Sequence, residues 1–273
     1  MNFSTLNRWL LSLFVIILLS QCQSSPTTQE ATGPRTLLAI FAHPDDEATV
    51  SPVLAKYAAE GVTVYLAIAT DGRYGVTDHA KIPAGDSLAA VRVEEAKCAA
   101  EKLGIQPPIL FGLHDQLKMG EGFGPLHDQL NTMREKVKEL FTTLKPDVVI
   151  TWGASGWTGH HDHRLVSAVV TEVFQSQKWE KPMHLYYSAI PTGNLPADSP
   201  MQLATVDYSF LPIKIPIAEA DYEKAKASWH CHKSQYTPET VEGMHQLIRA
   251  SLKGTAYFQP LVVDPKERHS LFN

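Results

Sequence analysis

The chain has 273 residues, of which 44% are hydrophobic and 19% charged, a composition typical of globular proteins and unlike collagen-like, coiled-coil or wholly disordered chains. Its 24 Lys and Arg against 29 Asp and Glu give a net charge of −5, without the basic excess of most nucleic-acid-binding proteins, so we expect no nucleic acid as partner. Three cysteines are too few for a disulfide framework.

Residues 1–21 have the pattern of an export signal. The nearly unbroken apolar run from Trp9 to Leu19 is short for a membrane span of about 20 residues but matches the core of a signal peptide. The segment Leu19-Ser20-Gln21-Cys22 resembles the lipobox of bacterial lipoproteins, although Gln21 replaces the usual small residue. We therefore expect an exported protein of the bacterial envelope, anchored to the membrane by lipid on Cys22. Plain secretion and an uncleaved anchor are the alternatives.

A short linker follows the signal. Residues 22–35 contain no bulky apolar side chain and indicate a flexible tether, so we expect one folded domain over residues 36–273. Cys98 lies in a helix-like stretch, Glu94–Ala100, where a lone cysteine is usually a small packed apolar residue.

In the first two thirds of this domain, apolar runs of strand length alternate with segments that carry helix signals. In chain order we predict a strand at Thr36–Ala42, a helix at Thr49–Glu60, a strand at Val62–Thr70, a helix at Asp86–Leu103, a strand at Pro108–Phe111, a helix at Leu126–Leu144, a strand at Asp147–Trp152 and a helix at His161–Phe174. Continuous apolar strands are typical of burial on both faces. The alternation therefore predicts an α/β fold, a Rossmann-like and mainly parallel sheet flanked by helices.

The last third of the domain has a less regular pattern, which is typical of an α+β segment. We predict strands at Leu185–Ala189, Ala204–Phe210 and Ile213–Ile217, and helices at Ala220–His232 and Pro238–Ser251. The sequence shows no internal repeat and no second linker, which favours a single domain.

Metal-ligand residue types are concentrated after two of the predicted strands. The first strand runs into His43-Pro44-Asp45-Asp46-Glu47, and the strand ending at Trp152 is followed, after a loop of small residues, by His160-His161-Asp162-His163. Ligands of doubly wound sheets bind beyond the carboxyl ends of the strands. The two clusters would meet there if their strands are neighbours in the sheet.

The residue types in these clusters suit a hydrolytic metal site. A catalytic zinc takes three protein ligands and keeps one position open for water, and two imidazoles with one carboxylate supply that set. A spare Asp and a spare His remain for proton transfer. Alone, the first cluster also fits a solvated helix N-terminus, whose dipole favours acidic side chains, and the second fits a solvated polar turn. Two such clusters after two buried strands favour the metal site.

These motifs resemble those of the LmbE-like/PIG-L family of metal-dependent N-acetylglucosaminyl deacetylases. Residues 42–47 are similar to the family's HPDDE signature, and residues 159–164 to its G-H-P-D-H-R motif, with His161 in place of proline. Arg73 stands where the family's T-x-G-E-x-G loop usually has glutamate, which bears on substrate preference. Further similarity extends over Thr70-Asp71-Gly72, Arg92–Gly104, Asp115, Lys145–Ile150 and His232–Gln235.

The resemblance implies a role for each motif residue. It implies that His43, Asp46 and His163 bind zinc and that Asp45 is the general base. It also implies that His160, oriented by Asp162, stabilises the oxyanion and protonates the departing amine. Candidate substrate contacts are Arg92, Asp115 and His232 at family positions, the charged Arg73, and the aromatic Trp152 and Trp157. The alternatives are packing for the tryptophans and His232, a salt bridge for Arg92 and Asp115, and a solvated surface position for Arg73.

The implied activity is zinc-dependent removal of the N-acetyl group from an N-acetylglucosamine-type sugar or glycoconjugate, releasing acetate and a free amine. A site of two histidines and one aspartate also accepts Fe²⁺, Mn²⁺ or Co²⁺. One alternative is a lipid-anchored sugar- or metal-binding protein without turnover, which would not need the base and the oxyanion donor. The same ligand set occurs in non-haem iron oxygenases, but these are built on β-barrels, in conflict with the strand–helix alternation.

Overall fold

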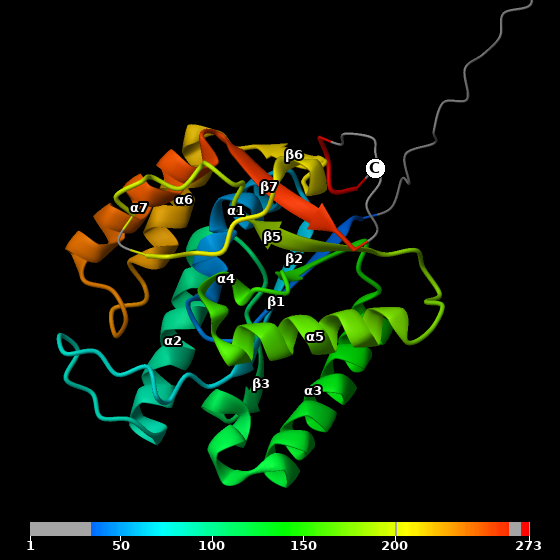
Figure 1. Ribbon diagram of the computed structural model, residues 1–273, viewed down its shortest axis with the longest axis vertical. Coiled ribbons are helices and arrows are strands. Elements are labelled where there is room, and N and C mark those ends of the chain that lie inside the picture. The colour runs from blue at the N-terminus through cyan, green and yellow to red at the C-terminus, as the bar shows by residue number, and fades with distance from the viewer. Residues whose placement is uncertain (1–33, 200, 262–268, 273) are drawn as a thin grey trace, which may run out of the picture. The chain divides into compact units, whose positions relative to one another are not determined.

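A seven-stranded sheet in the order β3-β2-β1-β4-β5-β7-β6 lies at the centre of the part of the chain that the structure describes, residues 34–199, 201–261 and 269–272. In this computed structural model (Figure 1), β1 to β5 are parallel, and β7 runs antiparallel to both β5 and β6. The strands are β1 (Thr36–Phe41), β2 (Thr63–Thr70), β3 (Ile109–Leu113), β4 (Val148–Trp152), β5 (His184–Ala189), β6 (Ile213–Pro216) and β7 (Thr255–Pro260).

Helices cover both faces of this sheet. The α-helices are α1 (Ser51–Ala59), α2 (Asp86–Leu103), α3 (Phe123–Leu144), α4 (Gly156–Gly159), α5 (His161–Gln175), α6 (Glu219–Trp229) and α7 (Pro238–Leu252), and the 3-10 helices are η1 (Asp46–Thr49), η2 (Asp115–Glu121) and η3 (Tyr208–Phe210). Residues of α1, α2, α6 and α7 belong to the apolar core on one face, and residues of α3 and α5 to the core on the other. The predicted α/β class is therefore confirmed.

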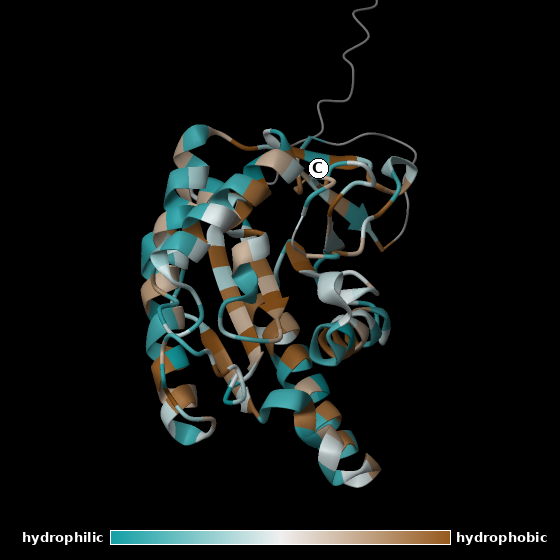
Figure 2. Cartoon of the chain, turned by 60° about the vertical axis from the view of Figure 1, so that its left-hand side comes forward, coloured by the Kyte–Doolittle hydropathy of each residue, from teal (hydrophilic) through white to brown (hydrophobic). Residues whose placement is uncertain are grey.

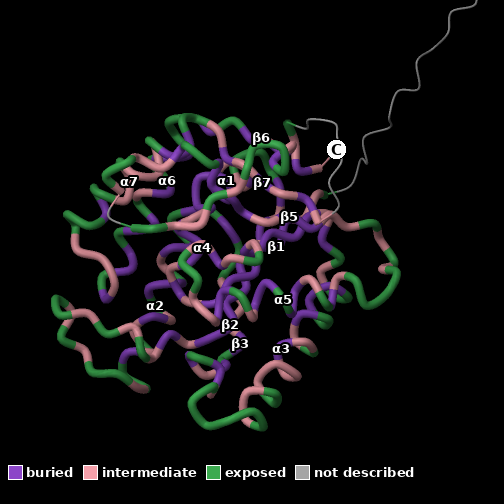
Figure 3. Tube along the Cα trace, viewed as in Figure 1, coloured by how far each residue is buried: buried purple, intermediate pink, exposed green. Residues whose placement is uncertain are grey.

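The strands form because their side chains are buried on both sides. Leu37 and Phe41 of β1 point into one core, Leu38 and Ile40 into the other, and all four are fully buried. Figure 2 shows the resulting apolar strands between helices that are hydrophilic on their outer sides, and Figure 3 shows the same contrast in burial. A strand that is covered by helices on both faces of the sheet must be apolar throughout, which explains the continuous apolar runs in the sequence.

The strand order reverses between β1 and β4. These strands are parallel neighbours, with Leu37 opposite Val148 and Ala39 opposite Ile150. The chain leaves β1 toward α1 on one face and leaves β4 toward α5 on the other. Such a reversal opens a crevice at the carboxyl ends of the strands. The adjacency on which the predicted site depends is therefore present.

One prediction for the last third is wrong, and one strand was not predicted. Ala204–Phe210 is not a strand: Val206 forms an isolated bridge with Pro191, and Tyr208–Phe210 is a 3-10 turn in which Asp207 accepts the N–H of Ser209. These aromatic residues are exposed and have no buried face to hold a strand. The antiparallel strand β7 was not predicted, although its alternate residues are buried.

The prediction for Cys98 is also wrong. Cys98 of α2 forms a disulfide with Cys231, which follows α6, across a sequence separation of 133 residues. Packing of α2 against α6 brings the two Cα atoms to 5.7 Å. Nothing in the local pattern around either cysteine signals this pairing.

The predicted signal segment, Cys22 and the tether up to residue 33 lie outside the described residues. Among the residues that are described, no helix is both long and apolar enough to cross a membrane.

Candidate metal centre

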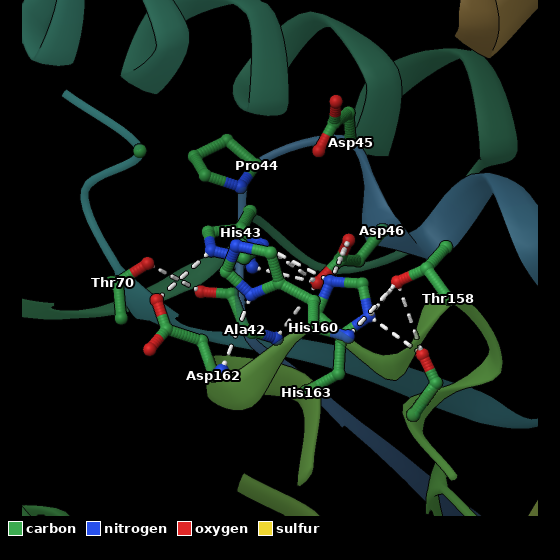
Figure 4. Close-up of polar contacts among 12 residues, drawn as sticks. Ala42, His43, Pro44, Asp45, Asp46, Thr70, Thr158, His160, Asp162 and His163 are labelled. Atoms are coloured by element: carbon green, nitrogen blue, oxygen red, sulfur yellow. Dashed lines mark hydrogen bonds and ion pairs between the residues drawn. The ribbon is translucent and has the colours of Figure 1, made fainter. Parts of the chain in front are cut away.

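The two predicted clusters meet at the carboxyl ends of β1 and β4 (Figure 4). Nδ1 of His43 lies 3.2 Å from Nε2 of His163, and Asp46 places one carboxylate oxygen 3.2 Å from His163 and the other 3.4 Å from His43. Ligand atoms that sit about 2.0–2.1 Å from a tetrahedral zinc are separated by about 3.3 Å. The three side chains are therefore spaced as ligands of one ion, and their donor types fit zinc.

The turn η1 fixes the carboxylate of Asp46. Oδ2 of Asp46 accepts the backbone N–H of Ala42 at 3.0 Å and that of His43 at 2.8 Å, which folds the side chain back over the end of β1. Oδ1 is left facing His163. Despite burial, the charges of His163 and His43 hold the pKa of Asp46 well below its usual range, so it is a carboxylate.

His163 is held by β4 and by the loop that follows it. Its Nδ1 donates to the carbonyl of Gly156 at 2.9 Å, which leaves Nε2 free to bind a metal. The indole of Trp152 stacks on the ring. A Cβ on Gly156 would lie 2.7 Å from that of His163, and Gly156 has a φ of +62°. Only glycine fits there.

His43 is oriented by two buried carboxylates. Its Nε2 lies 3.1 Å from Oδ2 of Asp162 and 3.4 Å from Oδ1 of Asp115. Burial opposes a charge on this ring, but Asp46 and the hydrogen bonds to Asp115 and Asp162 raise the pKa of His43 well above its ordinary value. A carboxylate behind a ligating imidazole raises its basicity and fixes its tautomer.

The predicted contact between the Asp162 carboxylate and His160 is therefore absent. Oδ2 of Asp162 faces His43 and accepts the N–H of Gln116 at 2.8 Å. His160 precedes α5, and its Nδ1 instead accepts the backbone N–H of Asp162 at 3.2 Å, as an N-cap does. In the neutral ring this leaves the proton on Nε2. His160 packs edge-on to His43, with centroids 4.8 Å apart.

Asp45 lies beside the centre but its carboxylate is turned away from the three ligands (Figure 4). It contacts Nη2 of Arg92 at 2.9 Å and accepts from the hydroxyl of Tyr236 at 3.2 Å. Burial raises the pKa of Asp45, and the charge of Arg92 works against that rise. The backbone φ of Asp45 is +134°, a strained value of the kind that clusters at functional sites. Its role as the base stays a prediction.

Arg92 lies behind Asp45. Besides Asp45, its guanidinium donates to the carbonyls of Pro44 at 2.6 Å and Gly72 at 2.9 Å, and it is 3% exposed. A Cβ on Gly72 would lie 2.4 Å from Nη1 of Arg92. The guanidinium therefore positions the HPDDE segment, in place of the expected substrate contact.

The remaining predicted substrate contacts divide into buried and partly exposed residues. Trp152 is 1% exposed, so it does not face a sugar. Trp157 donates from Nε1 to the carbonyl of Ser188 and packs against Trp152. Arg73 is paired with Asp71 and Asp86 on the loop after β2.

His232 is fully buried, so it too is not available to a sugar. Its Nε2 lies 2.5 Å from Oε1 of Glu47. Burial opposes a charge on this ring, but Glu47 raises the pKa of His232. Sequence reasoning assigned no role to Glu47, although it closes the HPDDE motif, or to Tyr236, which no motif marked.

Comparison with known proteins identifies the family to which this chain belongs. The model of the PIG-L family, described as GlcNAc-PI de-N-acetylase, matches residues 38–174, half of the chain, so the chain belongs to this family. The membership predicted from the motifs is therefore confirmed.

One relative and two solved structures show the range of similarity. A 1D-myo-inositol 2-acetamido-2-deoxy-α-D-glucopyranoside deacetylase of Mycobacteroides abscessus is 31% identical over 176 residues, 59% of this chain and 62% of the relative, so the match spans less than two thirds of it. The N,N'-diacetylchitobiose deacetylase of Pyrococcus horikoshii has a TM-score of 0.59 at 18% identity, over 87% of this chain and 86% of its own.

The second structure is the 4-carboxy-2-hydroxymuconate hydratase GalB of Pseudomonas putida. It has a TM-score of 0.61 at 15% identity, over 86% of this chain and 100% of its own. A hydratase thus shares the fold with deacetylases, so the fold alone does not define the reaction.

Proposed function

We propose that this chain is a zinc-dependent deacetylase of the bacterial envelope that hydrolyses the acetamide of an N-acetylglucosamine-type sugar or glycoconjugate. The observation that carries the proposal is the spacing of His43, Asp46 and His163, whose ligand atoms lie 3.2–3.4 Å apart at the strand-order reversal. N-acetylated glucosamine as substrate is supported by the activity after which the family is described, GlcNAc-PI de-N-acetylase.

The side chains around the centre suit amide hydrolysis. His43, Asp46 and His163 would hold the ion, which when bound supplies Lewis-acid activation of the acetamide carbonyl and of water. Asp45, released from Arg92 by rotation of its side chain, takes the proton of the attacking water, a contribution of about 10²–10⁴-fold. The C–O bond then forms and the C–N bond breaks.

His160 completes this scheme. Its Nε2–H donates to the oxygen on which negative charge develops, which contributes on the order of 3 kcal/mol. The proton that Asp45 takes from the water then goes to the departing amine, because a neutral His160 has no second ring proton to give. Asp162 and Asp115 act through His43, whose ring they hold in place.

We also propose that the protein works outside the cytoplasm, with lipid on Cys22 as its anchor. The export pattern of residues 1–21 supports this, and so does the Cys98–Cys231 disulfide, because structural disulfides persist mainly in oxidising compartments. An envelope or scavenged glycan then fits better as substrate than a cytosolic metabolite.

The test is acetate release by the full chain, purified in detergent, stripped of metal and reloaded with one equivalent of zinc. N-acetylglucosamine, N,N'-diacetylchitobiose and N-acetylglucosaminyl-inositol would be screened with and without chelator. We expect release from at least one of them, lost on chelation and restored by zinc. Asp45→Asn should keep its metal and lose about 10²–10⁴-fold in turnover. Tight binding of a sugar without any acetate would instead identify a binding protein.

A further inference from the structure

His161, where this chain departs from the family's proline, lies next to two other potential metal ligands. It is the first residue of α5, and its ring stacks on that of His160 with centroids 4.5 Å apart and planes 19° from parallel. Its Nε2 lies 3.3 Å from Oδ1 of Asp162. One ligand atom from each of His160, His161 and Asp162 can be chosen so that all three lie within 4.8 Å of one another.

Two of these atoms are buried and make no hydrogen bond. Asp162 is fully buried, and while its Oδ2 serves His43, its Oδ1 has no hydrogen-bond partner. The same is true of Nε2 of His161. A buried polar atom without a hydrogen bond costs about 1–3 kcal/mol, and one ion bound by both of these atoms, which lie 3.3 Å from each other, would satisfy them together.

We propose that His160, His161 and Asp162 form a second site for a divalent cation of the zinc class. The 3.3 Å between His161 and Asp162 matches the separation of about 3.3 Å expected for two ligands of one zinc ion. Asp162 then serves both centres, through Oδ2 behind His43 and through Oδ1 as a ligand.

The second site is weaker than the first. Ligation through Nε2 of His160 places the ring proton on Nδ1, and this removes the hydrogen bond from the backbone N–H of Asp162. The consequence for activity rests on the proposed function: a His160 that holds a cation cannot donate to the reacting oxygen. Excess zinc therefore inhibits the enzyme.

His161→Pro removes one ligand with little strain. The backbone of His160, at φ −57° and ψ 134°, already has the conformation of a residue before proline. Proline is also favoured at the first position of a helix. His161→Gln is a second variant that keeps a polar side chain and needs no proline.

The experiment is a zinc titration of the metal-free full chain against a chromophoric chelator. We expect two classes of site in the wild type, and in both His161 variants retention of the tight class with at least about 10-fold weakening of the other. Inhibition by excess zinc should shift to correspondingly higher concentration. His127→Gln, at an exposed histidine of α3, controls for non-specific binding and should keep both classes.

A single class of site in the wild type, or two unchanged classes in both His161 variants, would overturn the second site. The proposed function would survive that result. Conversely, a chain that binds zinc in both classes but releases no acetate would contradict the proposed function and leave the second site standing.

Discussion

The indole of Trp152 lies parallel to the imidazole of His163, with ring centroids 4.5 Å apart and an angle of 11° between the planes. Trp152 ends β4 and is 1% exposed, so the stack ties a ligand on α5 directly to the sheet. Together with the bond from Nδ1 of His163 to Gly156, it fixes the direction of Nε2.

We therefore expect Trp152→Phe to weaken zinc binding by about 10-fold, the effect typical of losing a group that orients a ligand. The measurement is competition with a chelator. Trp179→Phe is the matched control, since Trp179 packs on Phe141 in the α3 core and should leave zinc affinity unchanged. Equal losses in both variants would show a general effect on packing.

Arg92 is predicted to position Asp45. Arg92→Lys should lower turnover by about 10–100-fold, because a lysine cannot reproduce the fork that binds Asp45, Pro44 and Gly72 together. Zinc content should not change. Arg134→Lys, at the pair with Glu172 between α3 and α5, is the control. A raised KM with unchanged kcat would instead support a substrate contact.

The buried pair of His232 and Glu47 is predicted to stabilise the fold. His232→Ala leaves the carboxylate of Glu47 buried without its partner, which should cost about 3–5 kcal/mol of unfolding free energy. Urea denaturation measures this, with the exposed His230→Ala as a variant of small effect. A loss below 1 kcal/mol for His232→Ala would contradict the prediction.

The disulfide should contribute to stability as well. Replacing both Cys98 and Cys231 by alanine should lower the unfolding free energy by about 2–4 kcal/mol, because a crosslink over a long loop restricts the unfolded chain. Reductant should destabilise the wild type to a similar extent and leave the double variant unchanged. A wild type insensitive to reductant would mean that the two thiols are not bonded.

The sequence predicted most of the sheet because strands covered on both faces must be apolar. Thr36–Phe41 and Val148–Trp152 follow this rule, and the ligands come directly after them. That β1 and β4 are neighbours is a property of the strand order, which no local pattern states. The proximity of the HPDDE and HHDH clusters therefore follows from the resemblance to the family and from the structure, and not from the local sequence.

What sequence reasoning missed depends on contacts between distant segments. Cys98 meets Cys231, and Tyr236 reaches Asp45, only because α2 and the segment after α6 pack beside the HPDDE turn. The prediction that the Asp162 carboxylate contacts His160 was wrong for a similar reason. The first turn of α5 aims it at His43, 119 residues away, rather than at its neighbour His160.

The most direct test of a zinc ion shared by His43 and His163 is the X-ray absorption spectrum of the full chain loaded with one equivalent of zinc. We expect one ion bound by two imidazole nitrogens and a carboxylate oxygen at about 2.0–2.2 Å, and one imidazole fewer in His163→Gln. A spectrum without imidazole scattering, or one that His163→Gln does not change, would contradict a shared ion between His43 and His163.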